Sequence, residues 1–169
     1  MLVTREADYA VTCVLEVARY KHISAAEIAR RHDISSSFVA NIVHSLAKAG
    51  IAVTTRGAGG GVSLARPPDS LTLLEVIEAV QGRLTVNSCV AHPRQCDRTE
   101  GCSAYAVFRD VQNQLRLGLD VTFAELLEAS DESETHVADL YAATARPGPD
   151  GSSNTTTRTD ARPGGEGCA

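Results

Sequence analysis

Aromatic residues are scarce in this 169-residue chain, which has no Trp, four Tyr and three Phe. Domains that bind single-stranded nucleic acid commonly stack bases on aromatic side chains, so this composition argues against that class of protein. Long apolar runs are also missing, and none approaches the ~18–20 residues of a membrane-spanning helix. Arg5, Glu6 and Asp8 interrupt the N-terminus where a secretion signal would be apolar. We therefore expect a cytoplasmic protein.

Positive charge is scarce overall, but it is unevenly distributed. The formal net charge is −5, with eight Lys and Arg against five Asp and Glu in residues 1–66 and eight against sixteen in residues 67–169. The two parts therefore carry +3 and −8. This asymmetry is compatible with a nucleic-acid-binding domain joined to a part that does not touch the nucleic acid.

Three helices are predicted in the first 50 residues. Apolar residues recur every three or four positions over residues 4–20, as on the buried face of a helix. Ser24 and Glu27 have the spacing of a capping box and begin a second helix. The third helix starts in the serines at 35–37 and stops at Gly50. Its apolar stripe consists of Val39, Ile42, Val43 and Leu46.

A hairpin and further helices follow. Two β-branched runs at 51–55 and 62–64 flank a glycine-rich turn. The segment 83–101 has no periodicity and is predicted to be a loop. Three more helices are predicted at about 72–81, 102–119 and 122–129. The expected fold is mainly α, a winged helix-turn-helix with a long C-terminal dimerisation helix.

We divide the chain into three parts. Residues 1–66 form the predicted winged-helix DNA-binding domain. Residues 67–130 hold a cysteine-bearing loop and the dimerisation helices. Residues 131–169 are expected to be a flexible tail, acidic at first and then rich in Gly, Ser, Thr and Pro.

Three helices followed by a hairpin predict insertion of the third helix into the DNA major groove. With the apolar stripe inward, the outward face carries Ser37, Asn41, His44 and Lys48, with Phe38 and Ala40 at its flanks. Asn41 can form two hydrogen bonds with adenine. Arg56, at the hairpin tip before Gly59 and Gly60, suits a narrow minor groove. The alternative is that these are ordinary surface residues and turn glycines.

Five cysteines, an odd number without a secretion signal, argue against structural disulfides. Cys89, Cys96 and Cys102 lie in or beside the predicted loop, where three thiolates could converge on an iron–sulfur cluster, zinc or copper(I). The spacing lacks the C-x2-C pair of zinc ribbons, although His92 leaves a Cys3His zinc site open. A thiol redox switch and buried structural cysteines are the other interpretations. Cys13 is expected to pack in the first helix, and Cys168 in the tail is given no role.

Several motifs resemble the Rrf-type family of iron–sulfur regulators, the IscR/NsrR group, over about residues 1–130. They are Leu2-Val3-Thr4 with Asp8-Tyr9-Ala10-Val11, Gly50-Ile51 with Arg56-Gly57-Ala58-Gly59-Gly60-Gly61, Leu71-Thr72-Leu73-Leu74-Glu75-Val76-Ile77, the cysteine loop and Phe123-Ala124-Glu125-Leu126-Leu127. The resemblance implies a homodimeric regulator, most commonly a repressor, of palindromic double-stranded DNA sites. It also implies control by an iron–sulfur cluster that senses nitric oxide, redox or iron status. The implied dimer seam is Phe108, Val111, Leu115 and Leu119.

The resemblance also implies particular DNA contacts and cluster ligands. The base-reading positions would be Ser35, Ser37, Phe38, Ala40 and Asn41, with Arg56 in the wing. In IscR-type members the position of Ala40 can carry a glutamate that helps to select the DNA site, so their operator cannot be carried over. The implied cluster ligands are Cys89, Cys96 and Cys102.

The fourth cluster ligand departs from the IscR pattern. There a histidine follows the last cysteine by three residues, and here that position is Tyr105. NsrR-type members can use an aspartate of the first helix from the other subunit, which corresponds to Asp8. An alternative is that Asp8 only complements the helix N-terminus, a contribution of ~0.3–1 kcal/mol. Other possible ligands are water, His92, Glu6, Glu100 and Tyr105.

The competing functions differ in their chemistry. A regulator of the same fold could use zinc or thiol oxidation instead of an iron–sulfur cluster, and a winged helix could also bind protein rather than DNA. No nucleotide-binding motif or Ser/His/Asp set indicates an enzyme, and a small electron carrier would normally supply four cysteines.

Overall fold

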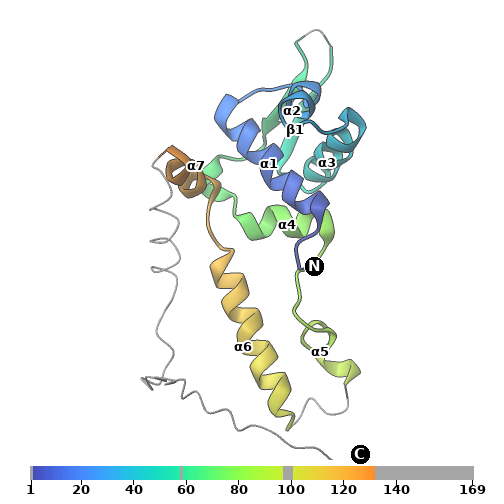
Figure 1. Ribbon diagram of the computed structural model, residues 1–169, viewed down its shortest axis with the longest axis vertical. Coiled ribbons are helices and arrows are strands. Elements are labelled where there is room, and N and C mark those ends of the chain that lie inside the picture. The colour runs from blue at the N-terminus through green and yellow to red at the C-terminus, as the bar shows by residue number, and fades with distance from the viewer. Residues whose placement is uncertain (1, 58, 97–100, 132–169) are drawn as a thin grey trace, which may run out of the picture.

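The computed structural model describes residues 2–57, 59–96 and 101–131, and it is mainly helical with one two-stranded hairpin (Figure 1). Most of the predicted tail, including Cys168, lies outside the described residues, as does Glu100. The elements in chain order are α1 (Arg5–Tyr20), α2 (Ala25–Arg31), α3 (Ser36–Lys48), β1 (Ala52–Thr55), β2 (Gly61–Leu64), the 3-10 helix η1 (Pro68–Ser70), α4 (Leu73–Gln81), α5 (Ser88–Ala91), the 3-10 helix η2 (Pro93–Gln95), α6 (Ser103–Gly118) and α7 (Phe123–Asp131).

Helices α1, α2 and α3 each begin after a capping side chain; the caps of α2 and α3 were predicted, whereas Thr4, the cap of α1, was not. The side chains of Thr4, Ser24 and Ser35 each accept a hydrogen bond from the amide three residues later. Such a cap satisfies one of the amides that a helix start leaves without a partner, and typically stabilises the helix by about 1 kcal/mol. The predicted inward stripe of α3 is buried at all four positions, so the period of its apolar residues is confirmed.

The hairpin is antiparallel, with Thr55 opposite Gly61 and Ala52 opposite Leu64. Ile23, in the connection between α1 and α2, exchanges two backbone hydrogen bonds with Val62. The hairpin is therefore anchored to the helices along its second strand, and it projects from the top of the molecule in Figure 1.

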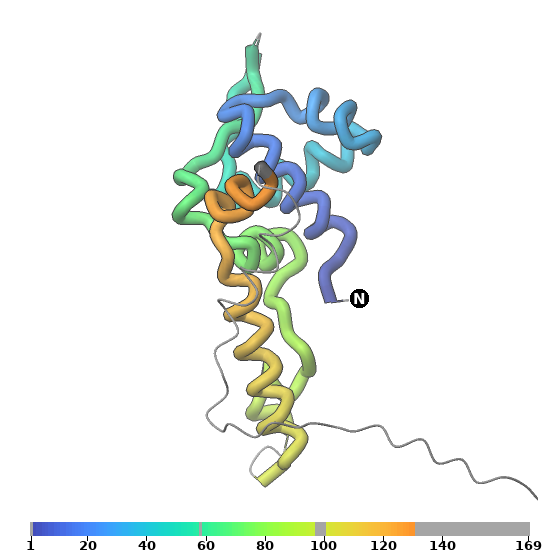
Figure 2. The backbone as a smooth tube through the Cα atoms, turned by 60° about the vertical axis from the view of Figure 1, so that its left-hand side comes forward, coloured from blue at the N-terminus to red at the C-terminus, as the bar shows by residue number. Residues whose placement is uncertain are grey.

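The core of the DNA-binding half also includes residues of α4 and α7 and the connection before α4. Helix α4 packs against α1 and α3, and α7 returns after α6 to contact α1 and η1 (Figure 2). Phe123 at the start of α7 is fully buried in the same core as Val14 and Ile42, and its amide donates to the Leu71 carbonyl at 2.9 Å. The apolar core is thus continuous across residue 66.

The predicted loop over 83–101 is corrected by two short helical turns, α5 and η2. Asn87 caps α5 by accepting from the Cys89 amide, and Pro93 opens η2 with its fixed φ. Turns of three or four residues are too short to produce a repeating apolar pattern, so periodicity could not reveal them. No helix among the described residues combines the length and apolarity that crossing a membrane requires.

Candidate DNA interface and cysteine segment

Helix α3 presents short polar side chains on its outer face. Ser35, Ser37 and Asn41 are exposed, as is Ala40 between them, while the opposite side of the helix is buried. Phe38 is half-buried, with its ring edge-on to Tyr9 at a centroid distance of 5.6 Å. The predicted major-groove residues therefore lie together at the start of one helix, with Phe38 tied to α1.

The hairpin places Arg56 beyond the end of β1, in an exposed turn. Gly57 and Gly59 adopt φ of 106° and 84°, in the left-handed region that glycine tolerates best. A Cβ on Gly60 would lie 2.5 Å from the Thr55 carbonyl oxygen. These three glycines let the turn fold closely enough to hold Arg56 at its tip.

His22 braces this hairpin, a contact that no local pattern in the sequence predicts. Its Nε2 lies 3.0 Å from the Gly59 carbonyl oxygen and its Nδ1 lies 3.0 Å from Ser63 Oγ. A carbonyl oxygen only accepts, so Nε2 carries the proton and donates to Gly59. A Cβ on Gly61 would approach the His22 ring to 2.7 Å, so a glycine is needed for the ring to reach the turn.

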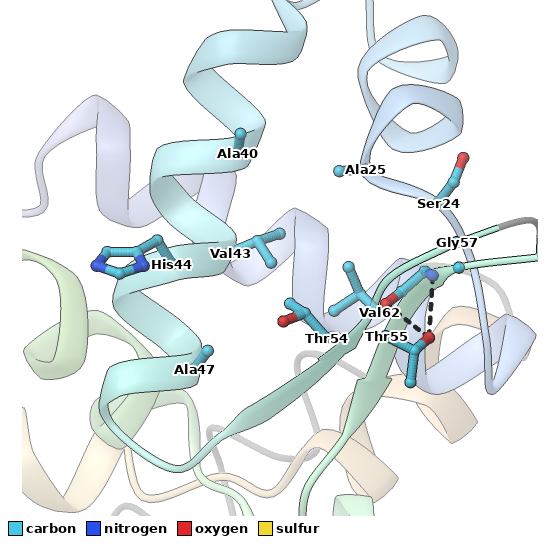
Figure 3. Close-up of a pocket in the computed structure, with 12 residues that line it drawn as sticks. Ser24, Ala25, Ala40, Val43, His44, Ala47, Thr54, Thr55, Gly57 and Val62 are labelled. Carbon is cyan, nitrogen blue, oxygen red and sulfur yellow. Dashed lines mark hydrogen bonds between the residues drawn. The ribbon is translucent and has the colours of Figure 1, made fainter.

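A groove of about 430 Å³ separates α3 from the hairpin (Figure 3). Ala40, His44 and Ala47 line its helix side, whereas Thr54 and Gly60 line its hairpin side. Ala40 and Ala47 on one wall and Gly60 on the other have small side chains or none, so a DNA backbone could approach these walls closely. His44, which the sequence placed on the outward face of the helix, is exposed here.

Only some cations of the DNA-binding half remain available to a partner. Arg30 and Arg31 both bind Glu27, and these hydrogen bonds lower the pKa of the Glu27 carboxyl to about 2. Among the described residues, Lys48 at the end of α3 and Arg56 in the hairpin form no ion pair. Arg5, Arg19 and Lys21, on or directly after α1, are likewise in none of the described ion pairs, so Lys48 and Arg56 are two of several cations in this half that a partner could bind.

The cysteine segment, whose described residues are 87–96 and 101–102, lies at the opposite end of the molecule from the hairpin (Figure 1). Cys89 lies on α5, Cys96 is the C-cap residue of η2, and Cys102 is the N-cap residue of α6. All three are half-buried and none is in a disulfide. Helix α5 packs against α6, so both ends of the segment are attached to the same long helix.

These cysteines provide the donor chemistry of an iron–sulfur site, but the described side chains are not gathered at one point. Within residues 2–57, 59–96 and 101–131, no three His, Cys, Asp or Glu side chains lie close enough together to hold a metal ion. His92, between α5 and η2, is exposed, and Tyr105 is half-buried in the first turn of α6. The fit to a cluster therefore rests on the thiols and their shared attachment to α6.

Asp8 lies in the first turn of α1, where its side chain is exposed. Glu6, the neighbouring alternative, is half-buried. Helix α1 is in the upper half of Figure 1 and α5, which carries Cys89, is in the lower half, and no described metal-binding group joins Asp8 to the cysteines of its own chain.

Cys13 is separated from this chemistry. It is fully buried in the core of the DNA-binding half, as its expected packing role requires. Burial, and secondarily the charge of Glu16, raises the pKa of the Cys13 thiol to about 12. Thiolates bind metals and react with oxidants, so a Cys13 thiol that stays protonated is inert toward both.

Helix α6 exposes an apolar side that the described chain leaves uncovered. Val107 is 60% exposed, Phe108 38% and Val111 45%. Phe108, Val111, Leu115 and Leu119 were the predicted seam, and Leu115 and Leu119 are half-buried near the packed end of the helix. Val107, one turn before Val111, is exposed on the same side and was not among the predicted seam residues.

Comparisons with known proteins agree with this arrangement. Residues 3–129 match the family described as "Rrf2: Iron-dependent Transcriptional regulator". The HTH-type transcriptional regulator IscR of Citrobacter koseri is 32% identical over 148 residues, which cover 82% of this chain and 90% of the relative. A putative transcriptional regulator from Listeria innocua superposes with a TM-score of 0.65 at 26% identity, covering 79% of this chain and 90% of that one. T. potens IscR has the same fold, with a TM-score of 0.64, 24% identity and coverage of 79% and 91%.

Proposed function

The chain belongs to the Rrf2 family of transcriptional regulators, and we propose that it binds DNA as a homodimer whose affinity depends on the state of Cys89, Cys96 and Cys102. Membership of this family makes it a DNA-binding transcriptional regulator and not an enzyme. Ser35, Ser37, Phe38, Ala40 and Asn41 would face the major groove, and Arg56 with Gly59 and Gly60 would face the minor groove.

An iron–sulfur cluster is the cofactor that best suits the cysteine segment. The observation that carries this proposal is that three cysteines outside any disulfide are attached to one helix in a chain 32% identical to IscR. Such a cluster, when bound, supplies a centre that reacts with nitric oxide and oxygen. Cys89, Cys96 and Cys102 would hold it.

The protein's own contribution is to connect those thiols to the DNA-binding surface. Cys102 is the N-cap residue of α6, and α5 with Cys89 packs on the same helix. A rearrangement of these thiols therefore acts on the helix whose apolar side is proposed to pair two protomers. In a dimer, that helix sets the spacing of the two α3 helices, which must match half-sites about one DNA turn (~34 Å) apart. Loss of that spacing would release the promoter, so repression is the mode we propose.

Asp8 is proposed as the fourth ligand, donated by the partner subunit. Its exposed carboxylate and its distance from the cysteines of its own chain support a role across the dimer. An oxygen ligand is held more weakly by iron than a thiolate, which suits a site that must respond to a signal.

A mixed-dimer experiment tests the Asp8 ligand. D8N protomers retain the cysteines, whereas Cys96→Ser protomers retain Asp8, so only a mixed dimer contains one complete site. We expect the wild-type visible spectrum at one site per mixed dimer and at none in either parent. If D8N alone gives the wild-type spectrum and nitric oxide response, Asp8 only complements the α1 dipole.

Anaerobic purification with iron and acid-labile sulfide analysis tests the cofactor itself. We expect a coloured protein containing both elements, loss of colour in Cys96→Ser, and no change in the control Cys168→Ser. A colourless protein containing zinc would replace the cluster with a Cys3His site including His92. A colourless, metal-free protein would favour regulation by thiol oxidation. That alternative does not require three metal ligands to lie together, and the described side chains form no such group.

A further inference from the structure

Gln112 is a buried polar side chain on α6, a helix whose other side chains are exposed or half-buried. It is 6% exposed, and it is the one residue of α6 that the fold buries. Burying a carboxamide is unfavourable unless its hydrogen bonds are replaced. Its position therefore requires a specific partner.

That partner is the chain leading into the cysteine segment. Gln112 Nε2 donates to the Leu84 carbonyl oxygen at 3.0 Å, and Oε1 accepts from the Val86 amide at 2.9 Å. A neighbouring β-strand would bind the same two groups, on either side of Thr85. The Gln112 carboxamide thus makes the two hydrogen bonds that a neighbouring strand would make. It holds residues 84–86 in one register relative to α6.

A second contact holds the same chain to α4. Glu78 Oε1 accepts from the Leu84 amide at 3.1 Å and from Arg116 Nη1, one turn after Gln112, at 2.8 Å. Leu84 itself is 2% exposed, so the point of attachment is also anchored in the core. Residues 84–86 are therefore fixed to both α4 and α6.

This attachment lies between the two parts of the proposed switch. Val86 is three residues before Cys89, and a register slip of two residues would displace the following chain by about 6.6 Å at ~3.3 Å per residue. On the other side, α4 packs against α1 and α3. Gln81 of α4 also accepts from the Thr4 amide at 2.8 Å and donates to the Leu2 carbonyl at 3.1 Å, which fixes the start of α1.

We propose that Gln112 is a positioning residue that transmits the state of the cysteine segment to the DNA-binding half. It does so by holding residues 84–86 against α6 in a single register, so that movement of the cysteines moves α4 and α6 together. The inference rests on the proposed cysteine-dependent function. It adds a residue that touches neither DNA nor the cysteines.

The test compares Gln112→Leu with Asn113→Leu, which removes an exposed carboxamide from the same helix. Each full-length protein, purified without oxygen, is titrated with the duplex that the wild type selects from a random pool. The titration is repeated after a nitric oxide donor and, separately, after hydrogen peroxide. Allosteric couplings are commonly 5- to 150-fold in affinity. The Kd ratio is the DNA dissociation constant after treatment divided by that before it. We expect a ratio of about 5 or more for the wild type and N113L, and a ratio near 1 for Q112L.

Amide hydrogen exchange supplies a readout that a general loss of stability would not reproduce. In Q112L the Val86 amide, which donates to Gln112, should lose protection, whereas the Leu84 amide, which donates to Glu78, should keep it. Gln112→Glu provides a second variant if Q112L does not fold. Its carboxylate can accept from Val86 but cannot donate to Leu84, so it should protect the Val86 amide and still lower the Kd ratio.

The outcomes separate this inference from the proposed function. If the wild type responds to nitric oxide or peroxide and Q112L responds equally, with only a lower melting temperature, then Gln112 is merely structural and the inference is overturned. If the wild type responds to neither reagent, the proposed cysteine-dependent regulation is itself wrong, and the role of Gln112 fails with it.

Discussion

The proposed pairing of two chains through α6 makes a sharp prediction, because the helix exposes large apolar side chains on two different sides. Val111 is 45% exposed and lies with Val107 and Phe108, whereas Leu117 is 56% exposed. Six residues separate Val111 from Leu117, which places them about 120° apart around the helix at ~100° per residue. Val111→Asp should therefore break the dimer, and Leu117→Asp should not.

The size of the effect follows from the exposed area. Burying a valine side chain completely is worth ~1.5–3 kcal/mol, so covering the exposed 45% of Val111 contributes about 1 kcal/mol. A two-fold interface contains the residue twice, which gives about 2 kcal/mol and a dimer Kd roughly 30-fold weaker in V111D. Placing a carboxylate in the apolar interface adds a desolvation cost, so this figure is a lower bound.

Sedimentation velocity over a concentration series measures that Kd directly. Neither substitution removes a buried group of the protomer, and aspartate has a helix propensity close to that of valine but below that of leucine. Leu117→Asp is therefore the harsher change for the helix alone. Equal weakening by both variants, or no weakening by V111D, would refute pairing through this side of α6.

Three further predictions concern the DNA-binding half. Arg56→Ala should weaken operator binding by about 10-fold and reduce the salt slope of log Kd by about one, and an unchanged slope would argue against a phosphate or groove contact. Gly61→Ala should destabilise the protein by ~1–3 kcal/mol in urea titration, because the added Cβ meets the His22 ring at 2.7 Å and the Ile23 carbonyl oxygen at 2.9 Å. Iodoacetamide at about pH 8 should leave Cys13 unmodified in the folded protein, since burial raises its pKa to about 12, and early alkylation there would contradict that burial.

Local signals in the sequence were sufficient for most of the architecture. The three-and-four spacing of apolar residues predicted α1, and the capping residues Ser24 and Ser35 marked the starts of α2 and α3, all to within a few residues. Those signals depend on residues about one helical turn apart, so they can be recognised in the sequence without knowledge of the fold. The winged helix-turn-helix order follows from them and from the glycine-rich hairpin.

Features set by distant contacts could not be predicted in the same way. His22 lies 37 residues from Gly59 and Gln112 lies 26 residues from Val86, and nothing in the local pattern relates either pair. The burial of Phe123 in the same core as Val14 likewise depends on α7 returning to α1. The candidate cluster ligands were suggested by residue type and resemblance, which specify donors but not the geometry that gathers them.

The central claim is that the segment cysteines control DNA affinity, and one titration tests it most directly. Operator Kd is measured for one anaerobic preparation before and after nitric oxide, in the wild type and in Cys96→Ser. The account predicts that the wild type loses at least about 10-fold in affinity and that Cys96→Ser shows no change on treatment, a difference of about 1.4 kcal/mol or more. An unchanged wild-type Kd, or the same loss in Cys96→Ser, would contradict it.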